Sequence, residues 1–172
     1  MPVSRKQLKD IMAKVTPNLP FVVENTGRID LWSMLMGVPT SSPNMATQWN
    51  EDCSFDTFIV DPTLLTVAPN MECVAMIASH EYAHVMLKSC GKNNPHEENR
   101  ADLFGYDRML EVGYDPRKAI EMWDASAKWA RERGLANVGE VHSDDDVRLN
   151  TMLKWIEKHH TTIEARFGKE GK

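Results

Sequence analysis

The apolar residues of this chain recur mostly at helical spacing, and the residues that flank them mark where the helices begin and end. Ser4 and Gln7 form a capping-box pattern ahead of one such stretch, which predicts a helix over about residues 5–15. Asn70 precedes another stretch, which is apolar nearly all round over residues 71–88. A helix of this kind is expected at the centre of a domain, buried on most sides.

Three further helices are expected in the second half of the chain. One begins after Asn94, with Pro95 at its first position, and stops at Gly113. The next covers about residues 116–133, and the last covers about residues 144–163.

Short strands are expected before the central helix. Residues 21–24 and 28–32 flank an Asn-Thr-Gly turn and predict a hairpin, and residues 56–61 form a third strand that Pro62 ends. No regular element is expected over residues 37–56. The pattern as a whole predicts a mostly helical α+β fold with a small antiparallel sheet.

Length and charge narrow the choice of function. The 172 residues are expected to form a single domain, residues 1–172. The net charge of −5 and the scattered basic residues argue against a nucleic-acid partner. The chain has neither the apolar core of a signal peptide nor about eighteen consecutive apolar residues, so we expect a soluble protein without membrane insertion.

The cysteines bear on the compartment. Cys53, Cys73 and Cys90 are odd in number and lack the spacing of metal ligands. Cys73 falls in the apolar central helix, where it is expected to be a small core residue. The set fits a reducing compartment better than a disulfide framework, and a cytoplasmic protein is expected.

Candidate chemistry lies in the middle of the central helix, at His80-Glu81-Tyr82-Ala83-His84. Two histidines four residues apart on a helix can both reach one tetrahedral metal ion. Glu81 then lies beside the open coordination position, where a carboxylate can take a proton from a metal-activated water. The motif predicts a Zn²⁺ site with His80 and His84 as ligands, and its alternative is a buried helix with two satisfied histidines.

A third ligand is expected soon after the histidine pair, and both His96 and Glu98 can reach. Glu98 is favoured because Asp102 follows it on the same helical face, with the small Ala101 between them. Asp102 is then expected to accept the second ring N–H of a ligand histidine and fix its tautomer.

These residues carry a family resemblance. His-Glu-x-x-His, the Glu98-x-x-Ala101-Asp102 segment, and Gly-Tyr-Asp-Pro at residues 113–116 resemble the zinc metallopeptidase family of the bacterial membrane protease HtpX, the CAAX prenyl proteases and their small soluble relatives. The resemblance covers about residues 56–156. It implies a zincin-like, gluzincin-type domain built on a central HExxH helix, with Glu98 as the third zinc ligand.

The resemblance also implies roles for two later residues. His142 is similar to the family's late histidine, although Ser143 stands where the family has proline. His142 is expected either to donate a hydrogen bond to the oxyanion or to act as an inhibitory ligand. Arg148 is expected to hold this segment by pairing with a carboxylate such as Asp102.

The expected function is zinc-dependent peptide hydrolysis with Glu81 as general base. The substrate is a peptide or protein, which could pair with an edge strand near Phe58–Val60, although that strand could equally be core sheet. One rival is the gluzincin-like type of small protease encoded beside repressors. Another is a protein with a protease fold that binds a partner, whose zinc site is structural or latent and closed by His142.

Overall fold

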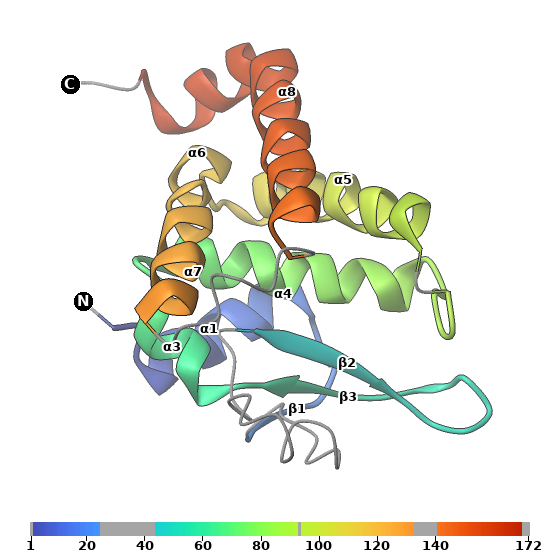
Figure 1. Ribbon diagram of the computed structural model, residues 1–172. Helices are drawn as coiled ribbons and strands as arrows, with labels where there is room; N and C mark the ends of the chain where they lie inside the picture. The colour runs from blue at the N-terminus through green and yellow to red at the C-terminus, as the bar shows by residue number, and fades with distance from the viewer. Residues whose placement is uncertain (1, 25–43, 93, 133–140, 170–172) are drawn as a thin grey trace.

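The computed structural model describes residues 2–24, 44–92, 94–132 and 141–169, with the backbone alone at residue 130 and over 141–146. The helix α4 (Met71–Met86) lies in the middle of the molecule (Figure 1). The sheet and α1 cover one side of α4, and α5 covers another side with α8 packed on it. The other elements are, in chain order, α1 (Arg5–Val15), β1 (Phe21–Val23), β2 (Met45–Trp49), β3 (Phe55–Val60), α3 (Pro62–Val67), α5 (Pro95–Val112), α6 (Pro116–Ala119), α7 (Glu121–Glu132) and α8 (Val141–Phe167).

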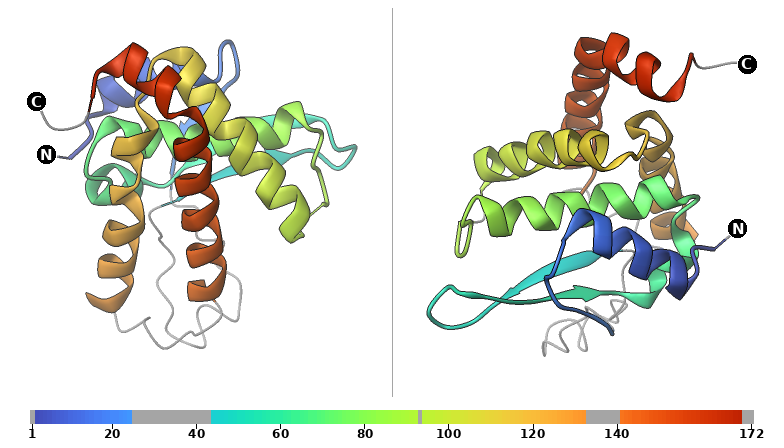
Figure 2. Two further views of the ribbon diagram at one scale, coloured as in Figure 1. Left: turned by 90° about the horizontal axis from the view of Figure 1, so that it is seen from above. Right: turned by 180° about the vertical axis from the view of Figure 1, so that it is seen from behind.

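This arrangement confirms the expected mostly helical α+β fold with α4 as its central helix. The Asn70 side chain caps α4 by accepting from the backbone N–H of Cys73 at 2.9 Å. α4 packs against α1, α5, α6 and β2, seen from two further sides in Figure 2. Because most of its surface is covered, polar side chains in its middle need partners within the protein.

The sheet is mixed, whereas the sequence pattern predicted an antiparallel one. Its strand order is β1-β3-β2, with β1 parallel to β3 and β2 antiparallel to β3. The predicted hairpin partner of β1, residues 28–32, lies outside the described residues. The parallel pairing of β1 joins residues far apart in the chain, which a local hairpin signal does not report.

β3 is the central strand of this sheet, so the expected peptide pairing at Phe58–Val60 is wrong. Phe58 and Val60 are fully buried, as the core-sheet alternative predicted. The edge strand that packs against α4 is β2, in a stretch expected to have no regular element. The apolar alternation that marks a strand is hidden here because Thr47, a polar residue, faces α4 and bonds to a polar partner.

The predicted helix ends agree well where capping residues mark them. α1 begins after a complete Ser4–Gln7 capping box, and α5 begins after Asn94, whose side chain accepts from two backbone N–H groups. The helix expected over 116–133 is divided at Ile120 into α6 and α7. α8 begins before and ends after its predicted bounds, and the short α3, capped by Asp61, was not expected.

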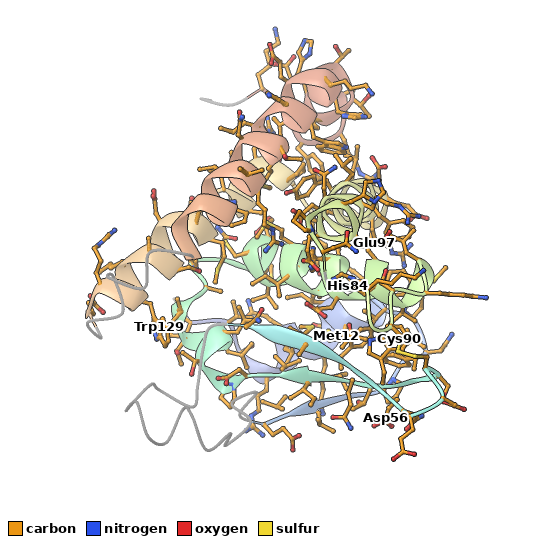
Figure 3. All side chains as sticks on the ribbon, turned by 45° about the vertical axis from the view of Figure 1, so that its right-hand side comes forward. Met12, Asp56, His84, Cys90, Glu97 and Trp129 are labelled. Carbon is orange, nitrogen blue, oxygen red and sulfur yellow. A yellow bond between two sulfur atoms is a disulfide. The ribbon has the colours of Figure 1, made fainter. Side chains whose placement is uncertain are left out.

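A disulfide joins Cys53, in the turn between β2 and β3, to Cys90, just after α4. Figure 3 shows Cys90 beside the far end of this hairpin. The sequence reasoning did not expect this disulfide, and with it the cysteines give no argument for a reducing compartment. Cys73 is free and fully buried, as expected of a core residue. Spacing alone could not reveal the pair because it joins segments that only the tertiary fold brings together.

We predict that the Cys53→Ser/Cys90→Ser double variant is less stable than the wild type by about 3–4 kcal/mol. The crosslink spans 37 residues of sequence, so removing it restores conformational entropy to the unfolded chain. Urea denaturation followed by circular dichroism measures the free energy of unfolding. A dithiol reductant should lower the value for the wild type by a similar amount and leave the double variant unchanged. A wild type insensitive to the reductant would contradict the prediction.

Candidate metal centre

His80 and His84 project from successive turns of α4 toward one point. Their Nε2 atoms are 3.0 Å apart, and the two rings meet edge to face with centroids 4.7 Å apart. His80 is buried and His84 is partly buried. Figure 3 shows His84 between α5 and the sheet.

Glu98 reaches the same point from the first turn of α5. Its Oε2 lies 3.3 Å from His80 Nε2, and its Oε1 lies 3.6 Å from His84 Nε2. Donor atoms around a tetrahedral ion with bonds of about 2.0–2.1 Å are separated by about 3.3 Å. The two Nε2 atoms are 3.0 Å apart, and Glu98 approaches each of them through a different oxygen, which leaves room for one ion among the three side chains.

Glu81 is the second carboxylate near this point. Donor atoms of His80, Glu81 and His84 all lie within 4.8 Å of one another, so this group could hold a metal ion. His96, the other candidate for the third ligand, is 79% exposed at its side chain and pairs with Glu97 instead. Of the two carboxylates, Glu98 has the shorter contacts with both imidazoles.

Asp102 and Arg148 form hydrogen bonds on the Nδ1 side of the His80 ring, opposite the centre. Asp102 Oδ1 accepts from His80 Nδ1 at 2.8 Å, which leaves Nε2 directed at the centre. The Arg148 guanidinium donates to both oxygens of Asp102, at 2.7 and 2.9 Å. Asp102 is only 3% exposed, so these bonds compensate the burial of its charge. The structure thus brings together His80, Glu98, Asp102 and Arg148, as the sequence pattern predicted.

Two contacts around these residues were not expected. A Cβ at Gly105 would lie 3.1 Å from the His80 backbone nitrogen, so glycine lets α5 approach α4 at this histidine. The sequence feature that could have predicted this close approach is an isolated glycine inside a helical pattern. Trp123 of α7 lies under the Arg148 guanidinium, 5.5 Å from ring centroid to Cζ. Its place on an apolar helix face gave no hint of this contact.

The metal-free centre holds a proton. Burial disfavours a charged His80, but hydrogen bonds with Asp102 and Glu98 outweigh burial and raise the His80 pKa to about 9. Burial and the neighbouring His80 charge both lower the pKa of His84. At neutral pH His80 is therefore cationic and His84 neutral. The second ring proton of His80 is on Nε2, the atom that faces His84 and Glu98. A metal ion that binds there displaces this proton.

A cleft of about 430 Å³ borders the centre. Glu81, His84 and Glu98 line its floor, and residues 44–47 and 49 line one wall. In that wall Thr47 Oγ1 donates to Glu81 Oε2 at 2.7 Å. Thr47 was missed because a lone threonine in a polar stretch carries no motif.

His142 lies in the first turn of α8, but its side chain is outside the part that the structure describes. The expected roles of His142 stay predictions. Within the described part of the chain, no helix combines the length and apolar character needed to cross a membrane.

Comparisons of the chain with models of protein families, with curated proteins and with solved structures found no match. The case for function therefore depends on the residues and geometry of the centre itself.

We predict that Asp102→Asn weakens Zn²⁺ binding by about 10- to 100-fold, since the amide lacks the charge that supports the His80 ring. Competition with a chromogenic chelator measures the dissociation constant. Glu111→Gln, a matched change near the far end of α5, should leave the constant unchanged. An Asp102→Asn protein that is folded and binds Zn²⁺ as tightly as the wild type would contradict this role.

Proposed function

We propose that this protein is a zinc-dependent endopeptidase in which Glu81 is the general base. The observation that carries the proposal is the convergence of two imidazoles and a carboxylate, with contacts of 3.0 to 3.6 Å, and with Glu81 beside them in an open cleft. The zincin-like architecture and the kinship with the HtpX and CAAX protease family are parts of the same proposal. The order of the HExxH, ExxAD and Gly-Tyr-Asp-Pro segments supports both.

The donor set suits zinc. His80, His84 and Glu98 would hold the ion through two nitrogens and a carboxylate oxygen, a combination typical of catalytic zinc sites, which keep a fourth position open. When bound, zinc polarises a carbonyl and lowers the pKa of a water molecule to about 7. Asp102 keeps the His80 lone pair on Nε2, and Arg148 keeps Asp102 in place.

Glu81 would take a proton from the attacking water and pass it to the leaving amine, so that one carboxylate serves in both steps. Thr47 bonds to Oε2 of this carboxylate, and the cleft opens on the same side of α4. The proton thus moves between the Glu81 carboxylate and groups in the cleft.

An extended peptide would bind along β2. Hydrogen-bonded pairs alternate along an antiparallel ladder, and Asn44 O accepts from Asp61 N. The backbone groups of Met45 and Thr47 therefore point away from β3, toward the outer edge of β2, where no strand pairs within the described residues. A substrate strand could pair with them, and its carbonyls would pass over His84 and Glu81.

We predict that Glu81→Gln lowers kcat by at least about 10²- to 10⁴-fold and leaves Zn²⁺ affinity close to that of the wild type. Glutamine keeps the shape of the side chain but cannot accept the proton. Cleavage of a diverse peptide library, read by mass spectrometry, identifies a substrate whose kinetics are then measured. Glu72→Gln, in the first turn of the same helix, is the matched control and should cleave normally.

Full activity in the Glu81→Gln protein would exclude Glu81 as the base. A zinc-loaded wild type that cleaves no peptide in the library would instead favour the interpretation of a partner-binding protein with a structural zinc.

A further inference from the structure

Two glutamates lie close enough to the histidine pair to serve as metal ligands. The Glu98 carboxylate lies 3.3 and 3.6 Å from the two imidazole Nε2 atoms, and Glu81 has an oxygen within 4.8 Å of the same histidines. A carboxylate that coordinates the metal cannot serve freely as a base, because its lone pairs are directed at the ion. A contact within the protein is therefore needed to favour one of the two carboxylates as the ligand.

The hydroxyl of Thr47 contacts one of the two. Thr47 Oγ1 lies 2.7 Å from Glu81 Oε2 and 3.1 Å from the Glu81 backbone oxygen. A hydroxyl donates one hydrogen at a time, and the charged oxygen at the shorter distance is the stronger acceptor. The bond therefore restrains the Glu81 carboxylate on the β2 side of the centre, while Glu98 approaches from α5.

Thr47 is partly buried and belongs to the edge strand itself. β2 is fixed by its ladder with β3 and by packing on α4, so the hydroxyl is held on a rigid element. The backbone of the same residue points to the outer edge of β2, where a peptide would pair. Thr47 thus holds the Glu81 carboxylate with its side chain and offers its backbone groups to the substrate.

We infer that Thr47 is a positioning residue that keeps Glu81 out of the metal's ligand set, so that Glu98 completes the set and Glu81 remains a free base. The role of Glu81 as base rests on the proposed function. The choice between the two carboxylates as ligands does not, and it can be measured without any substrate.

The first test uses Co²⁺ bound to the purified protein, because its visible absorption weakens as the coordination number rises. Thr47→Val removes the hydroxyl and keeps the β-branched shape, so Glu81 is expected to join the ligands and the absorption to fall. Thr47→Ser keeps the hydroxyl and should give the wild-type spectrum. Thr57→Val, a matched change on the neighbouring strand β3, should also give the wild-type spectrum.

The double variant Thr47→Val/Glu81→Ala distinguishes this effect from a general disturbance of the site. If Glu81 is the added ligand, its removal restores the intensity of the wild-type spectrum. An unchanged spectrum in Thr47→Val, or an altered one that persists in the double variant, would overturn the inference.

The second test is kinetic. Thr47→Val should lower kcat by about 10- to 100-fold with KM within about twofold of the wild type, and Thr47→Ser should restore kcat. A Thr47→Val enzyme with unchanged kcat would overturn the inference. A wild type without peptidase activity would refute the proposed function, while the Co²⁺ spectra would still decide the role of Thr47.

Discussion

The close approach of α5 to α4 at Gly105 is the constraint on which the centre depends. Without a side chain at that position, α5 lies against the backbone of His80, where a Cβ would be only 3.1 Å from its nitrogen. This contact sets Glu98 and Asp102, one turn apart on α5, on the two sides of the His80 ring. One carboxylate faces Nε2 and the other faces Nδ1, so a single helix supplies both a candidate ligand and the group that orients another candidate ligand.

The groups that compensate the burial of the ionisable side chains come from several elements of the fold. Burial disfavours an ionised Asp102, but bonds from His80 and Arg148 outweigh burial and lower its pKa. Arg148 comes from α8 and lies over Trp123 of α7, so the second half of the chain completes a site whose candidate ligands come from α4 and α5. β2 contributes from the opposite side through Thr47. The centre thus depends on the whole fold, although its candidate ligands lie within nineteen residues, from His80 to Glu98.

Much of this could be predicted from sequence because the signals are local. Caps such as Ser4, Asn70 and Asn94 mark helix starts by hydrogen bonds to residues two or three positions away, and their helices were placed almost to the residue. The facing of Glu98 and Asp102 follows from helix geometry alone. What failed involves partners distant in the chain: the parallel pairing of β1, the central position of β3 and the Cys53–Cys90 bond. The contact of Thr47 with Glu81 was missed for the same reason, since the two residues lie 34 positions apart.

The central claim is that the two histidines and Glu98 form an open zinc site. X-ray absorption spectroscopy of the zinc-loaded protein tests it most directly, because it reports which atoms surround the ion. The account predicts two imidazoles and one or more oxygen ligands at about 2.0–2.1 Å, with no sulfur near 2.3 Å. Three imidazoles around the ion with no water oxygen would contradict the claim, and this is the result expected if His142 closes the site. A sulfur neighbour would contradict it as well.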